Sequence, residues 1–242
     1  MEMKLNARML CIAAALCMGA AMLLPLEGAY AAAPGNARAL DEHPFALGSA
    51  QPEHPDSACT MPAPVDGKVL GIPVVYQGST MVCEGASLLQ ALRGKGLTDQ
   101  SLISFISSMP RTADGNPYNG YAGEWRHNVN GTYQGMMSAP VTSWARAFGS
   151  DAADITGSGA AGVRDEIRNG NPVVAWVTYG YASPEFRQMW WGRAVWNGHV
   201  IAVDGIREGA YHVVDPVFGS SWIDARTFEA AFNVTGMAVA VR

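Results

Sequence analysis

Residues 77–89 read QGSTMVCEGASLL and join a short apolar run, Val69–Tyr76, to a predicted helix. The apolar stripe of that helix recurs at helical spacing, at Val82, Ala86 and Leu89, with Leu88 and Leu92 beside it. Cys83 therefore lies in the first turn, where unpaired N–H groups and the helix dipole lower the pKa of a thiol. This position makes Cys83 a candidate nucleophile. The alternative is that it is a small buried hydrophobic residue.

The composition permits one folded domain of ordinary size with extensions. The chain has 242 residues, of which 49% are hydrophobic, enough to bury a core. Its formal net charge is −5, which gives no general electrostatic attraction to nucleic acid or to an anionic membrane. We therefore expect neither as a partner, and the sequence specifies no oligomeric state.

The N-terminus has the pattern of a signal peptide, residues 1–31. Lys4 and Arg8 precede an apolar run from Met9 to Leu26, and Ala29-Tyr30-Ala31 offers a cleavage site before Ala32. An uncleaved anchor is the alternative, although the apolar run is near the lower limit for spanning a bilayer. We expect cleavage, export to the periplasm, the cell surface or the medium, and no stable membrane insertion afterwards.

Residues 32–64 are rich in Pro, Ala, Gly, Asp and His and have no sustained apolar period, which predicts a flexible linker or arm. The folded domain is expected over residues 65–242. Once the signal peptide is removed, only Cys59 and Cys83 remain in an oxidising compartment, where a disulfide is one alternative to a free nucleophile. A metal site built from these cysteines with His199 and His212 lacks ligand pairs at zinc spacing, so we expect no metal and no cofactor.

The remaining pattern predicts helices first and strands last, which indicates an α+β fold with an antiparallel sheet. Helices are expected from Cys83 to a stop at Gly94, from a Thr98 cap to Pro110, from Ser138 to Phe148, from Gly159 to Asn169, and after an Asp224 cap. Strands are expected over Pro172–Tyr179, His199–Ile206, Tyr211–Val217 and Met237–Val241.

Two loops are candidate substrate contacts. Residues 114–125 are dense in Gly, Asn and Pro yet carry aromatic residues including Tyr121, which either wall a cleft or pack on the core. Residues 180–198 are long for a loop and contain Trp190, Trp191 and Trp196. The second segment is either a functional cover or a short helix that uses the tryptophans for packing.

His199 and Asp215 open and close two successive predicted strands. An odd-length loop centred on Arg207 places them directly opposite each other on one face, within reach of an imidazole–carboxylate hydrogen bond. A two-residue turn at Glu208-Gly209 places them on opposite faces instead. The sequence alone does not choose between these registers.

Cys83, His199 and Asp215 would supply a nucleophile, its base and the acid that orients the base. Gln77, six residues before Cys83, and the Cys83 backbone N–H would stabilise the oxyanion. Each residue also has a structural alternative: a hydrogen-bonded structural His, an Asp that ends a strand and a solvated Gln. His212 is a less favoured alternative base, because the odd-loop register puts it on the other face.

Several motifs, in order, resemble the peptidase C39-like family, a papain-like group related to the double-glycine leader peptidases of bacteriocin export. The motifs span about Val69 to Val241 and read IPVVYQ (72–77), CEGASL (83–88), NPYNGYAG (116–123), GNPVVAW (170–176), GHVIAVDG (198–205) and VDPVFG (214–219). The resemblance implies a papain-like α+β fold with Cys83 as nucleophile, His199 as base, Asp215 as orienting acid and Gln77 as oxyanion donor. Where many members have Gly before the Cys-Glu pair, this chain has the β-branched Val82.

Together these features predict an exported cysteine peptidase that acts on a peptide or protein substrate. A double-glycine leader is not implied as the substrate, because the exported relatives lack the transporter to which leader peptidases are fused. The alternative is a catalytically inactive papain-like module that binds a peptide or a cell-surface partner through its tryptophan-rich segment.

Overall fold

The computed structural model describes residues 67–242, so the predicted signal peptide (1–31) and arm (32–64) lie outside the described residues. The helices are α1 (Cys83–Gly94), α2 (Leu102–Ile106), α3 (Ser138–Ala147), α4 (Gly159–Arg168) and α5 (Ala225–Phe232), with a 3₁₀ turn η1 (Tyr179–Tyr181). The strands are β1 (Lys68–Val69), β2 (Ala153–Asp154), β3 (Val173–Thr178), β4 (Phe186–Met189), β5 (Gly192–Val195), β6 (Gly198–Arg207), β7 (Ala210–Asp215), β8 (Gly219–Asp224) and β9 (Ala238–Ala240).

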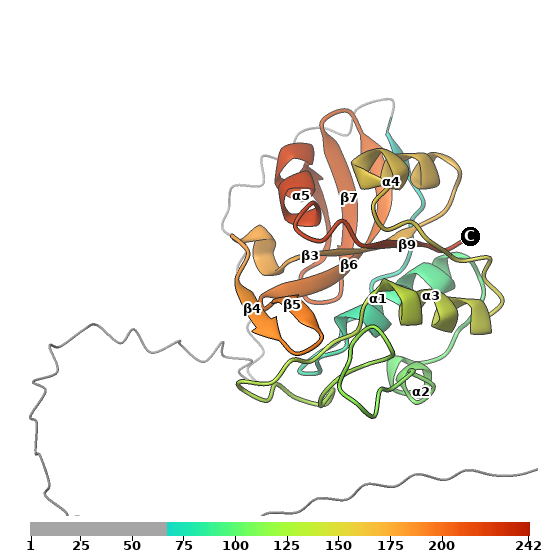
Figure 1. Cartoon of the computed structure of the whole chain (residues 1–242). Helices are drawn as coiled ribbons and strands as arrows, with labels where there is room; N and C mark the ends of the chain where they lie inside the picture. Colours follow the sequence, from blue (N-terminus) through green and yellow to red (C-terminus); the bar gives the residue numbers. More distant parts are fainter. Residues whose placement is uncertain (1–66) are drawn as a thin grey trace, which may run out of the picture. The chain divides into compact units, whose positions relative to one another are not determined.

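The main sheet is antiparallel and built around β6. Its order is β2-β9-β3-β6-β7-β8, and β1 pairs with the C-terminal part of β6. Figure 1 shows α1, α2 and α3 on one side of this sheet. The long hairpin of β6 and β7 forms part of the sheet and extends to the top of the view. The α+β fold class with an antiparallel sheet is therefore confirmed.

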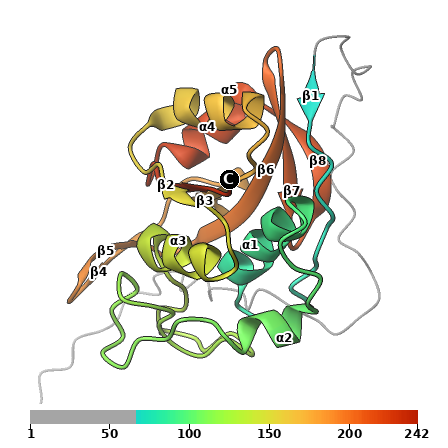
Figure 2. The same cartoon turned by 90° about the vertical axis from the view of Figure 1, so that its right-hand side faces the viewer.

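Helices cover both faces of the sheet. On one face α1 and α3 bury their apolar sides against Val174, Trp176 and Val200, whereas on the other face α4 and α5 pack on Val173, Ala175 and Ile201. Figure 2 shows the two helical layers with the sheet between them. Alternate residues of β3 and β6 thus serve two cores, which explains why these strands are apolar throughout. None of the helices in this described region is long and apolar enough to cross a bilayer.

The register of β6 and β7 differs from the odd-loop prediction. Arg207 pairs with Ala210, so the connection is the two-residue turn, but a bulge between Val203 and Gly205 shifts the ladder by one residue. Beyond the bulge Ala202 lies opposite Val214, which places Asp215 opposite Ile201 and one diagonal step from His199. The bulge therefore restores the shared face that the two-residue turn alone would remove.

The bulge is held by a buried carboxylate. Asp204 Oδ2 accepts hydrogen bonds from the backbone N–H groups of Gly71 (3.0 Å) and Ile72 (3.1 Å), and Oδ1 lies 2.5 Å from His212 Nδ1. His212 thus faces Asp204, on the side of β7 opposite Asp215. The contacts with Gly71 and Ile72 hold the segment that precedes Cys83 against the bulged strand β6.

Two further local predictions were wrong. Residues 180–198 form neither a long cover loop nor a helix: after η1 they form the β4–β5 hairpin, with Phe186 paired to Val195 and Met189 to Gly192. The N-cap of α2 is Ser101, whose side chain accepts from the Ser104 N–H, while Thr98 accepts from the Gln100 N–H in the preceding turn. The Asp224 cap of α5 is confirmed.

Candidate active site

The first residue of α1 is Cys83. The residue before it, Val82, has φ −112° and ψ 40°, a backbone conformation open to a β-branched residue, so the absence of glycine causes no strain there. Cys83 is partly exposed and carries a free thiol; Cys59 lies outside the described residues. The helix start thus places a free thiol beside N–H groups that α1 does not itself use.

His199 and Asp215 form a buried pair at the ends of β6 and β7. Nε2 of His199 lies 3.0 Å from both Oδ1 and Oδ2 of Asp215. Two backbone N–H groups, from Val217 (2.7 Å) and Phe218 (3.2 Å), also donate to Oδ1. The ring of Tyr179 meets the imidazole edge-on with a centroid separation of 5.4 Å.

The charge state of Asp215 follows from these contacts. Burial alone would raise the pKa of its carboxyl, but the charge and hydrogen bond of His199 and the two backbone donors outweigh burial and hold the pKa below its usual value. An ionised carboxylate only accepts hydrogen bonds, so Nε2 is the protonated nitrogen of His199. Nδ1 is therefore the nitrogen that is left to take a proton.

A hydrogen bond between α1 and β6 holds the two parts of the site together. Ser87, one turn into α1, donates through its hydroxyl to the backbone carbonyl oxygen of Val200 (2.9 Å), the residue after His199. This contact fixes the start of the helix against the start of the strand. The structure thus ties the helix that carries the predicted thiol to the strand that carries the predicted imidazole.

The thiol itself makes a contact that the sequence did not predict. Cys83 Sγ donates to Oε2 of Glu84 at 3.5 Å. Burial and then the Glu84 charge raise the pKa of the Cys83 thiol well above its usual value, and the Val200 backbone N–H offsets this only in part. The expectation of a lowered thiol pKa was wrong, because the thiol is itself desolvated and an acid stands beside it.

Gln77 lies close to the end of β7. Its backbone N–H donates to the carbonyl oxygen of Pro216 (2.9 Å), which ties the loop before α1 to the residue after Asp215. Its side chain is buried; Nε2 donates to the Thr80 carbonyl oxygen (2.7 Å), and Oε1 has no hydrogen-bond partner within residues 67–242. One N–H of the amide remains for another acceptor.

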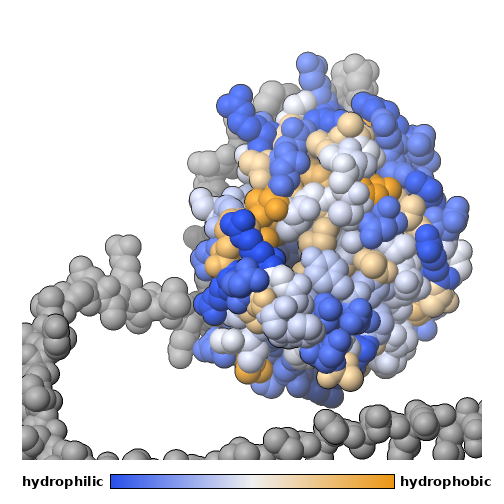
Figure 3. All heavy atoms as spheres, viewed as in Figure 1, coloured by the Kyte–Doolittle hydropathy of each residue, from blue (hydrophilic) through white to orange (hydrophobic). Residues whose placement is uncertain are grey.

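The three tryptophans all belong to the β4–β5 hairpin or its edge. Trp190 lies at the turn and is 70% exposed, while Trp191 packs edge-on against Tyr133 at 4.9 Å. Trp196 lies under the Arg187 guanidinium at 3.7 Å. In the space-filling view, strongly hydrophilic side chains lie beside hydrophobic ones on the left of the domain, where the hairpin is found (Figure 3).

Tyr121 has a different position from the one expected of a ligand contact. It is 2% exposed, and its hydroxyl donates to the Met81 carbonyl oxygen (2.5 Å). As a buried side chain it packs beneath the segment that enters α1. Of the two alternatives for the aromatic residues of segment 114–125, packing on the core is the one that Tyr121 follows.

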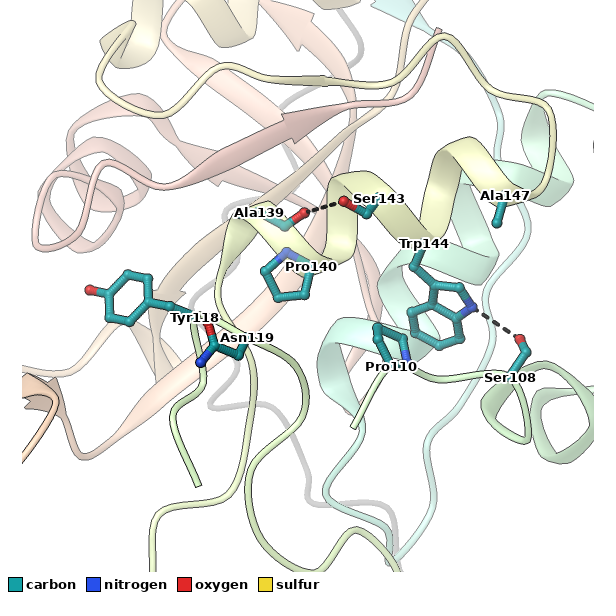
Figure 4. Close-up of a pocket in the computed structure, with 9 residues that line it drawn as sticks. All are labelled: Ser108, Pro110, Tyr118, Asn119, Ala139, Pro140, Ser143, Trp144 and Ala147. Carbon is teal, nitrogen blue, oxygen red and sulfur yellow. Dashed lines mark hydrogen bonds between the residues drawn. The ribbon is translucent and has the colours of Figure 1, made fainter. Parts of the chain in front are cut away.

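A separate shallow pocket of about 410 Å³ lies beside α3. Figure 4 shows Trp144 in its wall, donating to the Ser108 hydroxyl (3.0 Å), with Tyr118 at its far side. None of the candidate catalytic side chains lines it. Within the described residues no three His, Cys, Asp or Glu side chains gather in a way that would hold a metal ion.

Three solved structures are similar to this chain. A protein of Bacillus anthracis, provisionally assigned as a C39-like peptidase, matches with a TM-score of 0.64 and 19% identity over 73% of this chain and 98% of its own. A double-glycine-motif protease of an AMS/PCAT transporter, solved with its leader peptide, matches with a TM-score of 0.43 and 16% identity over 72% and 95%. The peptidase domain of Streptococcus ComA matches with a TM-score of 0.46 and 15% identity over 71% and 100%.

The first of these likenesses supports the fold, whereas the TM-scores of the other two are too low to support an inference. No curated protein matches the sequence. The sequence itself matches the Peptidase C39-like family over residues 69–239, which is most of the described region. The chain therefore belongs to the Peptidase C39-like family, and this membership supports a function of the peptidase type.

Proposed function

We propose that this protein is an exported cysteine peptidase that cleaves peptide bonds through Cys83, His199 and Asp215. The observation that carries the proposal is the buried pair in which Nε2 of His199 lies 3.0 Å from both oxygens of Asp215. That pair fixes the imidazole tautomer and leaves Nδ1 as a base near the start of α1. The hydrogen bond from Ser87 to the Val200 carbonyl oxygen also holds the strand that carries His199 against the helix that begins at Cys83.

In the first half of the reaction, the S–H bond of Cys83 breaks and its proton passes to Nδ1 of His199. The sulfur forms a bond to the peptide carbonyl carbon, and the carbonyl electron pair moves to oxygen. The ionised Asp215 stabilises the resulting imidazolium through Nε2. Collapse of the tetrahedral intermediate breaks the C–N bond, and the leaving amine takes the proton from Nδ1.

The second half hydrolyses the thioester. Nδ1 of His199 takes a proton from water, and the hydroxide oxygen bonds to the acyl carbon. The C–S bond then breaks to release a carboxylic acid, and Nδ1 returns its proton to the sulfur to restore the thiol. In both halves an oxyanion develops, for which the backbone N–H of Cys83 and the unused amide N–H of Gln77 are the proposed donors. The bond from Gln77 N–H to the Pro216 carbonyl oxygen supports this assignment, because it keeps Gln77 close to Asp215.

The β4–β5 hairpin is the proposed substrate contact. Trp190, Trp191 and Trp196 offer apolar and aromatic surface to an extended peptide, and Trp190 is the most exposed of the large hydrophobic side chains in the described region. Arg187 and Arg193, stacked on Trp196 and Phe186, add positive charge beside the aromatic rings. The proposed substrate is therefore a peptide or protein segment.

The proposed function is tested with a diverse peptide mixture. The purified protein is incubated with the mixture under reducing conditions, and new termini are identified by mass spectrometry. Cys83→Ala should abolish cleavage, while Cys59→Ala, the matched control at the other cysteine of the mature chain, should leave it unchanged. Cleavage that survives in Cys83→Ala, or retained peptide binding with no cleavage by the parent protein, would contradict the proposal.

A further inference from the structure

Glu84 is a buried acid for which the proposed reaction has no role. It follows Cys83 in the first turn of α1 and is 4% exposed. Its Oε2 accepts from Cys83 Sγ at 3.5 Å, and its Oε1 accepts from the Met136 backbone N–H at 2.8 Å. An acid in the first turn of a helix ordinarily points to solvent, where it complements the helix dipole.

The carboxyl group lies in a socket formed by a distant segment. A Cβ atom at Gly135, whose φ is +150°, would lie 2.6 Å from Glu84 Oε1, so a larger residue there would have to displace the carboxyl group. Gly135 is itself held by paired backbone hydrogen bonds with Ala122. The position of Glu84 is therefore specified by its surroundings.

In this socket the charge of the Glu84 carboxyl and the charge of the Cys83 thiol affect each other. Burial raises the pKa of Glu84 to about 7, and the hydrogen bonds from Met136 and from its own first-turn backbone only partly oppose this. The titratable groups that act on Glu84 and its neighbours from the packed elements are Cys83, His199 on β6, Asp215 on β7, and Tyr121 and Tyr133 from the loops. A thiolate beside an ionised Glu84 would put two like charges in one poorly solvated place.

We propose that Glu84 is a positioning residue that holds Cys83 as a protonated thiol until the Glu84 carboxyl takes up a proton. An ionised Oε2 accepts the S–H proton and so keeps it on sulfur. A protonated Oε2 becomes a donor toward sulfur, and the S–H proton can then pass to Nδ1 of His199 without creating a second anion. The inference rests on the proposed function, since it assigns a regulator to that nucleophile.

The test is the pH profile of Cys83 alkylation by iodoacetamide, without substrate, from about pH 5 to about pH 9. In the wild-type protein the rate should level off or fall as pH rises through the range in which Glu84 ionises. In Glu84→Gln, which keeps the shape but carries no charge, the rate above neutral pH should be about tenfold or more higher, because each unit of thiol pKa is a factor of ten in thiolate. Glu208→Gln, the same charge change on the exposed β6–β7 turn, should follow the wild-type profile.

Coincident profiles for Glu84→Gln and wild type, or slower alkylation in the variant, would overturn the inference. If Glu84→Gln does not fold, the wild-type profile decides: a rate that rises steadily with pH, as for a free thiol, contradicts the proposal. Peptide cleavage is scored separately. If the alkylation profile of Glu84→Gln is shifted but no peptide is cleaved, the Glu84 coupling holds and the proposed function is refuted. If peptides are cleaved but the profiles coincide, the proposed function holds and the Glu84 coupling is refuted.

Discussion

Two buried acids next to the thiol have opposite charge preferences. Asp215 receives His199 and two backbone N–H groups, and these hold its pKa low against the effect of burial. Glu84 receives the Met136 backbone N–H, its own backbone N–H and a weak S–H donor, which together do not compensate its desolvation. The number and strength of donors thus decide which carboxyl is the permanent anion and which one exchanges a proton near neutral pH.

The Glu84 pKa predicts a component of stability that declines with pH. Because the pKa is raised from 4.5 to about 7, the folded chain binds this proton more readily than the unfolded chain between those values. The free energy of unfolding should therefore fall as pH rises through that window, by about 3 kcal/mol for this group. Urea unfolding of wild type and Glu84→Gln across the window measures the difference between the two proteins.

Glu84→Gln should lose this decline, so its stability relative to wild type should increase toward neutral pH. The other acids titrate equally in both proteins and cancel in the comparison. Parallel pH dependences for the two proteins would show that Glu84 is not a raised-pKa acid. Glu208→Gln serves as the exposed control and should remain parallel to wild type.

At the residue scale, the sequence identified the chemistry but not its environment. Cys83, His199 and Asp215 were predicted as candidates because each residue type suits a thiol hydrolase, and because His199 opens one predicted strand and Asp215 closes the next. Glu84 was not recognisable, because a charged residue at a helix start normally indicates a solvated position. Its burial depends on Gly135 and on Met136, which lies 52 residues further along the chain.

At the scale of elements, the position of His199 relative to Asp215 depends on a single extra residue in β6. The two-residue turn would place the pair on opposite faces, and the bulge at Asp204 reverses that outcome. Such a bulge is stabilised by contacts with a segment more than a hundred residues earlier in the chain, at Gly71 and Ile72. The hydrophobic pattern of β6 and β7 alone does not encode it.

Removing the Asp204 carboxylate should loosen this bulge. Asp204→Ala leaves the backbone N–H groups of Gly71 and Ile72 and the ring of His212 without their acceptor, at a cost of about 3 kcal/mol or more in unfolding free energy. Asp224→Ala, which removes only the α5 N-cap, should cost about 1 kcal/mol. Urea denaturation compares them, and equal losses would show that Asp204 has no special part in the register.

The β4–β5 hairpin was missed because its sequence lacks the usual strand signals. Its turn is Trp190-Trp191, with no Asn-Gly or Asp-Gly pair. Half of its strand residues are exposed, and no polar–apolar alternation marks them. β8 was missed for a similar reason, since its glycine and serines have low strand propensity. The strands that were found are those that line the two cores.

The exposed hairpin tip gives a prediction about substrate binding. Trp190→Ala should raise KM for a cleaved peptide about tenfold, equivalent to about 1.4 kcal/mol, with little change in kcat or thermal stability. Ile103→Ala is the matched control: this α2 residue is 63% exposed but lies on another element. Equal KM values for both variants and wild type would remove the hairpin from the substrate site.

At the scale of the molecule, the proposed site draws its residues from segments that lie far apart in the sequence. α1 lies early in the described region and supplies the thiol, whereas β6 and β7 lie late and supply the imidazole and the carboxylate. Packing of α1 on the central strand, fixed by the bond from Ser87 to Val200, brings the two together. The layered α+β fold was predictable from the segregation of helices and strands, while the second helical layer depended on tertiary packing.

The proposed export predicts a shortened mature chain. Processing after Ala31 should give an N-terminus at Ala32, so the mature protein should lack Cys11 and Cys17. Intact mass and N-terminal sequencing of material from the extracytoplasmic fraction measure this. Recovery of the full-length chain in the cytoplasm alone would contradict the proposal.

The most direct measurement of the central claim is the rate at which a peptidyl acyloxymethyl ketone labels the folded protein, followed by intact mass and peptide mapping. The wild-type protein should be labelled once, at Cys83, and His199→Ala should be labelled on the order of 100-fold more slowly because the thiol has lost its base. Labelling of His199→Ala at the wild-type rate, or no labelling of Cys83 in the folded wild-type protein, would contradict the account.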